Sequence, residues 1–121
     1  MAKRILIADD DLDNVETVKL RLEASGYEIS STMGEKTVED AKKVKPDLIL
    51  LDVMMPGMDG FAVVRELKRD LDLSSVPVVI FSGKPKETMI ELFGPEGIAG
   101  YISKPYDPKE LVSQIQNLIG S

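Results

Sequence analysis

The stretch PDLILLDVMMPGMDG, residues 46–60, contains an unbroken apolar run, Leu48–Leu51, that ends on a carboxylate, Asp52. Uninterrupted apolar sequence of this length is typical of a parallel strand that is covered on both faces. The proline and the two glycines that follow predict a loop over residues 56–60. The stretch therefore predicts a buried central strand of an α/β protein, with an acidic group at its carboxyl end.

Strand-like runs alternate with helix-like patterns on both sides of this stretch. We expect strands at Ile5–Ala8, Tyr27–Thr32, Leu48–Leu51, Val78–Phe81 and Gly100–Ser103. We expect five helices whose core-facing residues are, in chain order, Leu12, Val15, Val18 and Leu22; Val38, Ala41 and Val44; Phe61, Val64, Leu67 and Leu71; Met89, Leu92 and Phe93; and Leu111, Val112, Ile115, Leu118 and Ile119. Strict β-α alternation predicts a parallel sheet with helices on both faces. Strands 48–51 and 78–81 should be interior, with 5–8 beside 48–51 and 27–32 at an edge.

Composition limits the function classes. The chain has 121 residues, which suits one domain, 1–121. Its net charge of −6 argues against direct nucleic-acid binding, which needs clustered lysines and arginines. There is no cysteine and no histidine, so disulfides, thiolate or imidazole metal sites and a Ser-His-Asp triad are excluded. We find neither a signal peptide nor an apolar membrane span, so a cytoplasmic location is the expectation.

Polar side chains follow four of the five expected strands. Asp9 and Asp10 follow the first, Asp52 the third, Ser82 the fourth and Lys104 the fifth. In open α/β sheets, ligands bind outside the carboxyl ends of the strands, where the strand order switches. Each residue alone has a simpler interpretation, since the aspartates after the first strand also suit a helix cap. Their coincidence at one edge of the sheet favours a functional site.

The charges at this edge indicate a metal. Two carboxylates about 4 Å apart repel by about 4 kcal/mol at an effective dielectric near 20. Lys104 supplies one positive charge, so we expect a hard cation, Mg²⁺ or its substitute Mn²⁺, among these oxygen ligands. An aspartate in such a setting can accept a phosphoryl group as an acyl phosphate, with positioning and charge stabilisation from the metal, the lysine and a hydroxyl.

Two other phosphate or metal motifs are rejected. Asp9, Asp11 and Asp13 imitate the start of an EF-hand loop, but Asn14 replaces its glycine and Leu20 its final glutamate. No glycine-rich loop follows the first strand, and aspartates in that place would repel the phosphate of a nucleotide or flavin.

The segments ILIADDD, PDLILLDVMMPGMDG, VPVVIFSG and YISKPY, at residues 5–11, 46–60, 76–83 and 101–106, resemble the receiver domains of bacterial two-component response regulators. They occur in family order and with family spacing over essentially the whole chain. The resemblance implies a three-layer, doubly wound (βα)5 sandwich, flavodoxin-like, with a five-stranded parallel sheet in the order 2-1-3-4-5.

The resemblance also implies which residues carry the chemistry. Asp52 would be the phosphoacceptor. Asp10, Asp52 and the backbone carbonyl of Met54 would bind Mg²⁺ directly, and Asp9 would hold a metal-bound water. Lys104 would pair with Asp52 and then with a phosphoryl oxygen.

Two further residues would form the switch. Ser82 would hydrogen-bond the phosphoryl group after transfer, and Tyr101 would be the aromatic that turns inward as Ser82 moves. The face formed by the helix around Met89–Phe93, the strand Gly100–Ser103 and the last helix would then change shape. The bond between Lys104 and Pro105 would be cis, as in the family.

The implied partners are proteins. The donor would be a phosphohistidine on a sensor histidine kinase or a histidine phosphotransfer protein. The output would be a downstream protein target if the chain stands alone, as in chemotaxis or relay receivers, or an effector domain if it is excised from a larger regulator. A monomer that can dimerise on phosphorylation is expected. The domain would assist only its own phosphorylation and hydrolysis, and so would not be an enzyme acting on a free substrate.

Some positions depart from the family pattern. Ser82 replaces the commoner threonine and keeps the hydroxyl, while Gly83 replaces the commoner alanine. Met54 and Lys84 occupy positions that flank the acyl phosphate. The glycine- and proline-rich segment 93–97 makes the end of the fourth helix the least defined boundary.

Two alternative functions stay open at this stage. A magnesium-dependent phosphatase with an aspartate nucleophile also uses strand-end carboxylates and a lysine, but its Asp-x-Asp-Gly-Thr pattern after the first strand is missing. A phosphorylation-independent interaction module on the same fold is disfavoured by the presence of Asp10, Asp52, Ser82 and Lys104 together.

Overall fold

A computed structural model describes residues 2–120. Its strands are β1 (Arg4–Ala8), β2 (Glu28–Thr32), β3 (Leu48–Leu51), β4 (Val78–Ser82) and β5 (Gly100–Ser103). Its α-helices are α1 (Leu12–Ala24), α2 (Thr37–Val44), α3 (Gly60–Arg69), α4 (Lys86–Phe93) and α5 (Pro108–Ile119), and short 3₁₀ turns lie at Gly34–Lys36 and Gly94–Glu96. None of the helices within residues 2–120 is long and apolar enough to cross a membrane.

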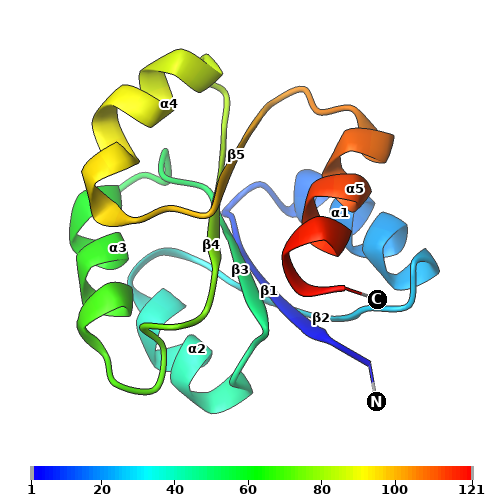
Figure 1. The fold of residues 1–121 in the computed structure, drawn as a ribbon, viewed down its shortest axis with the longest axis horizontal. Coiled ribbons are helices and arrows are strands. Elements are labelled where there is room, and N and C mark those ends of the chain that lie inside the picture. Colours follow the sequence, from blue (N-terminus) through cyan, green and yellow to red (C-terminus); the bar gives the residue numbers. More distant parts are fainter. Residues whose placement is uncertain (1, 121) are drawn as a thin grey trace.

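The five strands form one parallel sheet in the order β2-β1-β3-β4-β5. This confirms the expected order, with β3 and β4 interior, β1 beside β3 and β2 at an edge. Helices α1 and α5 cover one face of the sheet, and α2, α3 and α4 cover the other (Figure 1). The strand order reverses between β1 and β3, because the chain moves outward to β2 and then crosses back past β1. The reversal places a switch point at the carboxyl ends of β1 and β3.

Two apolar layers hold the helices on the sheet. Successive strand residues point to opposite faces, so neighbours in β3 belong to different layers. Leu48 and Leu50 pack with α1 and α5, whereas Ile49 and Leu51 pack with α2, α3 and α4. All four are at most 1% exposed. The unbroken apolar run is therefore explained, since both of its faces are covered.

Aspartates start three of the helices that leave this edge of the sheet. The carboxylate of Asp11 accepts a hydrogen bond from the amide of Asn14 (3.2 Å) at the start of α1. Asp59 accepts from the amides of Phe61 and Ala62 at the start of α3, and Asp107 accepts from Lys109 at the start of α5. The simpler interpretation of the aspartate run as a helix cap is thus correct for Asp11.

The expectation that Leu12 and Leu71 face the core is wrong. Leu12 is 67% exposed because it is the first residue of α1, at the carboxyl edge of the sheet, with no strand beneath it. Leu71 is 95% exposed because α3 ends at Arg69 and the backbone turns at Asp70, whose carboxylate accepts from the amide of Asp72. Leu73, which is 2% exposed, fills the core in its place.

Leu92 and Leu118 are also more exposed than expected, at 41% and 39%. In α4 the buried pair is Met89 and Phe93, four residues apart, and Leu92 lies beside that stripe. Helix α4 ends at Phe93, within the segment 93–97 whose glycines and proline made this boundary the least defined. A 3₁₀ turn follows the helix, and Gly97, with a φ of +74°, terminates that turn.

Candidate functional site

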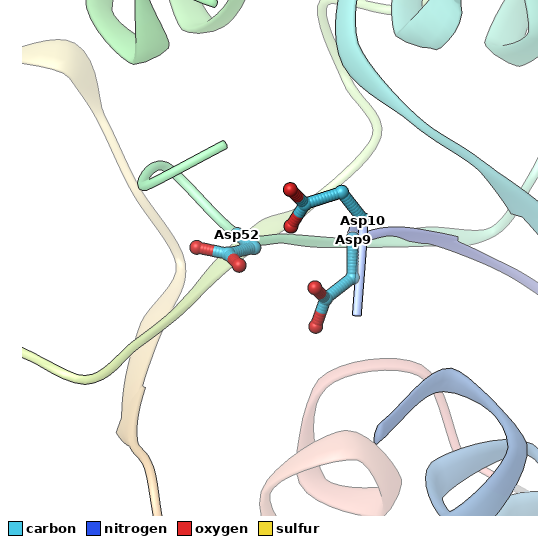
Figure 2. A group of neighbouring side chains, drawn as sticks. All are labelled: Asp9, Asp10 and Asp52. Atoms are coloured by element: carbon cyan, nitrogen blue, oxygen red, sulfur yellow. The ribbon is translucent and has the colours of Figure 1, made fainter. Parts of the chain in front are cut away.

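The site lies where β1, β3, β4 and β5 end at one edge of the sheet. The amide of Asp52 donates to the carbonyl of Ala8 (2.8 Å), and the amide of Lys104 donates to the carbonyl of Ser82 (2.7 Å). These bonds continue the backbone pairing of the strands by one residue. They hold Asp52 beside the end of β1 and Lys104 beside the end of β4. Figure 2 shows Asp9 and Asp10 at the end of one strand and Asp52 beside them at the end of the next.

Three carboxylates gather at this edge. Asp9, Asp10 and Asp52 each offer an oxygen, and these oxygens lie within 4.8 Å of one another. Asp9 and Asp52 are buried, at 3% and 6% exposed, whereas Asp10 is exposed. At such separations each pair of negative charges repels by about 3–4 kcal/mol at an effective dielectric near 20. The cluster therefore needs positive charge.

Lys104 supplies part of that charge. Its ammonium donates to Asp9 Oδ2 at 2.8 Å and to Asp52 Oδ2 at 3.1 Å. The ammonium also lies 5.0 Å from the centre of the Phe81 ring, within the range of a cation–π contact. From the sequence we expected Lys104 to pair with Asp52. In the structure its ammonium is shared between Asp52 and Asp9.

Asp9 is almost fully engaged within the protein. Its Oδ1 accepts from the amide of Asp11 (3.0 Å), and its Oδ2 accepts from the side-chain amide of Asn14 (2.7 Å) as well as from Lys104. Burial acts to raise the pKa of Asp9, but the bonds from Lys104, Asp11 and Asn14 outweigh it and hold this pKa below its usual value. Asp9 is thus a fixed negative charge.

Asn14 is a site residue that sequence analysis missed. It appeared there only as a residue that breaks an EF-hand pattern. The available signal was its place three residues after the cap Asp11, from which a first-turn side chain can reach back toward the end of the strand.

Asp52 has a different environment. Its Oδ1 accepts from the amide of Met54 at 2.8 Å. Burial raises the pKa of Asp52 more than Met54 and Lys104 lower it, and the charge of Asp9 raises it further. The pKa of Lys104 is raised as well, because its two carboxylate partners outweigh the opposing effect of burial. Asp52 is therefore the carboxylate of this pair that most needs a further cation.

Ser82 ends β4 and is fully buried. Its hydroxyl oxygen accepts from the amide of Lys84 (3.2 Å), and the carbonyl of Lys84 accepts from the hydroxyl of Ser103 (3.1 Å). These two bonds join the loop after β4 to β5. The contribution of Ser103 was not expected from the sequence.

The remaining predicted residues lie around this edge. Tyr101 is half-buried in β5, packs against the layer under α2, α3 and α4, and has a pKa raised by burial. The side chain of Met54 is 55% exposed. The peptide bond between Lys104 and Pro105 is cis, as expected.

The donor set fits a hard divalent cation. Carboxylate oxygens are the ligands that Mg²⁺ prefers. Asp9, Asp10 and Asp52 each offer one such oxygen, within 4.8 Å of the others. The one ammonium cannot balance three carboxylates, so a dication is electrostatically favourable here.

The fold and the site define a doubly wound α/β protein with a carboxylate–lysine centre at its switch point. The profile of the family described as response regulator receiver domain matches residues 5–116. The chain belongs to this family. It is thus the receiver domain of a two-component system, a signalling switch that accepts a phosphoryl group.

Individual relatives agree with this assignment. The chain is 36% identical over 118 residues to the DNA-binding response regulator MtrA of Mycobacterium tuberculosis strain H37Rv, covering 96% of this chain and 50% of MtrA. It is 38% identical over 119 residues to the response regulator PleD of Caulobacter vibrioides, covering 98% of this chain and 26% of PleD. The chain therefore spans half or less of the length of these relatives.

Among solved structures, the receiver domain of the sensor histidine kinase PA1611 from Pseudomonas aeruginosa is similar over 100% of both chains. The TM-score is 0.88 and the sequence identity is 25%. That crystal structure has a magnesium ion coordinated in its active-site cleft.

Proposed function

We propose that Asp52 is the phosphoacceptor and that it receives the phosphoryl group from a phosphohistidine of a sensor histidine kinase or a histidine phosphotransfer protein. An oxygen of Asp52 forms the new O–P bond as the P–N bond of the phosphohistidine breaks. The ring leaves as neutral imidazole, because its other nitrogen already carries a proton. The observation that carries this proposal is the shared ammonium of Lys104, 2.8 Å from Asp9 and 3.1 Å from Asp52.

The unequal engagement of the carboxylates supports a division of roles. Asp9 already accepts three hydrogen bonds from the protein, so its part in metal binding is to hold a metal-bound water. Asp10 is exposed and is therefore available as a direct ligand, together with Asp52 and the backbone carbonyl of Met54. A bound Mg²⁺, or Mn²⁺ in its place, would neutralise charge that develops on the phosphoryl oxygens.

Lys104, Ser82 and Tyr101 carry the consequence of phosphorylation. The phosphoryl group brings about −1.5 to −2 charge and three acceptor oxygens. Lys104 turns from Asp52 to one of these oxygens, and the hydroxyl of Ser82 leaves the amide of Lys84 to donate to another. Tyr101, half-buried against the layer under α2, α3 and α4, then moves inward, and the surface of α4, β5 and α5 changes shape.

The proposed context is a phosphorelay. Residues 1–121 form one receiver domain, of which residues 1 and 121 lie outside the described range. The output passes to a downstream protein or to an effector domain, and phosphorylation controls monomer–dimer exchange through α4, β5 and α5.

The phosphoacceptor is tested by intact-mass spectrometry after incubation with acetyl phosphate and Mg²⁺. The wild-type chain should gain the mass of one phosphoryl group, and chelation of the metal should abolish the gain. Asp52→Asn should gain nothing. Asp13→Asn, which removes an exposed carboxylate in the first turn of α1, is the matched control and should be phosphorylated normally. Phosphorylation of Asp52→Asn to the wild-type level would refute the assignment.

A further inference from the structure

A groove lies between α2 and α3. Both helices lie on the side of the sheet away from α1 and α5 (Figure 1). Its volume is about 450 Å³. It is lined by Glu35, Val38, Gly57, Met58, Asp59, Ala62, Val63 and Glu66. None of these residues belongs to the phosphorylation site or to the surface of α4, β5 and α5.

The floor of the groove is apolar. Val38 and Met58 are half-buried and pack against the core layer, and Val63 is 9% exposed. Ala62 is exposed at the start of α3, and its small side chain leaves the groove open. An apolar floor open to solvent favours a partner that covers it, because apolar surface is then removed from water.

The rim of the groove is acidic. Glu35, Asp59 and Glu66 stand around the floor, and no lysine or arginine lines it. Among residues 2–120, no ion pair within 4.0 Å involves Glu35 or Glu66. The carboxylate of Asp59 accepts amide hydrogen bonds at the start of α3.

Three cations on the neighbouring helices pair with carboxylates outside the groove. Lys42 pairs with Asp70 at 2.9 Å, and its pKa is raised mainly by that bond, with Glu66 acting on it only through space. Lys43 lies 3.5 Å from Glu39, and Arg65 lies 3.2 Å from Glu96. Because the lining holds three carboxylates and no cation, the groove presents negative charge around an apolar floor.

The two walls of the groove are connected, so its shape is formed before binding. The sulfur of Met55, which is 3% exposed, accepts from the amide of Gly34 (3.3 Å) and joins the turn before α2 to the loop before α3. The amide of Met58 donates to the carbonyl of Met55 (3.3 Å), which closes that loop on itself. A preformed groove loses little conformational entropy when a ligand binds.

We propose that this groove docks a basic amphipathic helix of a partner protein. Apolar residues one helical turn apart would cover Val38, Met58 and Ala62, and lysines or arginines beside them would meet Glu35, Asp59 and Glu66. Charge complementarity selects this partner over an acidic or uncharged segment, and helix-in-groove binding is an established mode for an apolar channel between helices. The proposal does not depend on the phosphorylation of Asp52.

The test uses the unphosphorylated 121-residue chain labelled with ¹⁵N and a synthetic peptide of about 14 residues, roughly four helical turns, with leucines on one face and lysines elsewhere. Backbone amide shifts should change at residues 35–38, 57–59 and 62–66. A peptide of the same composition with its leucines spread around the helix, and one with glutamates in place of lysines, should bind at least about tenfold more weakly.

Two double variants separate the groove from the overall negative charge of the chain. Glu35→Gln/Glu66→Gln should weaken peptide binding by about tenfold. Glu16→Gln/Glu23→Gln removes the same charge from exposed positions of α1, on the other face of the sheet, and should change binding by less than about twofold. Ala62→Gln, which fills the floor without a charge change, should also weaken binding.

Three results would overturn the proposal. They are an absence of binding by the basic amphipathic peptide, amide shifts that map outside the groove, and equal losses in the two double variants. Unfolding curves of each variant establish that it is folded. Every measurement uses unphosphorylated protein, so failure of the groove proposal leaves the phosphoacceptor assignment intact. Failure of the phosphoacceptor assignment likewise leaves the groove proposal intact.

Discussion

The carboxylate of Asp9 accepts a 2.8 Å hydrogen bond from the ammonium of Lys104, a residue 95 positions later in the chain. The same ammonium lies 3.1 Å from Asp52, so one half-buried cation serves two buried anions. The arrangement is one positive charge short, which affects both the stability of the fold and its response to a metal.

Removal of the charge of Lys104 should destabilise the metal-free protein. Lys104→Met keeps an unbranched apolar side chain but leaves Asp9 and Asp52 without their cation. We expect a loss of about 2 kcal/mol in the free energy of unfolding, below the 3–5 kcal/mol of a fully buried pair because the lysine is 22% exposed.

Asp52→Asn should have the opposite effect, because it removes a carboxylate whose pKa burial already raises. Urea unfolding in the presence of a chelator measures both, and equal stabilities of Lys104→Met and wild type would contradict this view.

Mg²⁺ should stabilise the folded chain, because the three carboxylates come together only in the native state. At a free Mg²⁺ concentration about 100 times the Kd, the gain is about 2.7 kcal/mol. Asp10→Asn removes the exposed carboxylate of the cluster and should abolish most of this gain while changing the metal-free stability little. Thermal unfolding with Mg²⁺ and with chelator measures the difference. A metal response in Asp10→Asn equal to that of the wild type would exclude Asp10 as a ligand.

Gly60 should not tolerate a side chain. A Cβ at this position would lie 2.9 Å from the Cβ of Val53 and 3.2 Å from its carbonyl oxygen, so Gly60→Ala forces the start of α3 away from the loop after β3. We expect a loss of about 1–3 kcal/mol in urea unfolding. Gly83→Ala is the control, because a Cβ there meets nothing within 4 Å and its φ is not positive. It should be neutral or slightly stabilising, since alanine lowers the entropy of the unfolded chain.

Leu73 and Leu71 should differ sharply in their contribution to stability. Leu73→Ala leaves a cavity in the layer under α2, α3 and α4 and should cost about 2–5 kcal/mol. Leu71→Ala removes a side chain that is 95% exposed and should change stability by less than about 0.5 kcal/mol. The same denaturation assay compares them, and similar losses would mean that the chain after α3 follows a different path.

The ion pair between Lys42 and Asp70 should make stability depend on pH. The hydrogen bond from Lys42 lowers the pKa of Asp70 below its ordinary value of 3.8, so the folded state binds the proton less readily than the unfolded state. This contribution is present above pH 3.8 and is lost as the pH falls through the folded-state pKa. The pKa of Lys42 is raised from 10.5 by the same bond, so its contribution is present below that value and is lost as the pH rises through the folded-state pKa.

Lys42→Met should therefore lower stability near neutral pH and reduce the loss on acidification. Lys43→Met is the control, because Lys43 pairs only with the exposed Glu39 at 3.5 Å. Urea unfolding across the acidic range compares the two variants. Parallel pH profiles for wild type and Lys42→Met would show that the pair does not contribute.

Sequence alone determined the order of elements and the polar residues that meet at the carboxyl edge of the sheet. The apolar run Leu48–Leu51 lies among alternating strand and helix patterns, which together specify a covered parallel sheet. A strand with apolar side chains on both faces is unfavourable in water unless both faces are buried. Asp9, Asp10, Asp52, Ser82 and Lys104 follow from the same pattern, since parallel strands bring their carboxyl ends to one edge. Family motifs supplied the strand order and the roles.

Only the tertiary structure decided how these groups share their contacts. Lys104 divides between Asp9 and Asp52, and Asn14 holds Asp9, because the crossovers and the twist of the sheet set distances between residues that are far apart in the sequence. The exposure of Leu12 and Leu71 has the same origin. Apolar periodicity reports which face of a helix is suited to burial, but burial itself depends on where the helix ends and on what lies beneath that end.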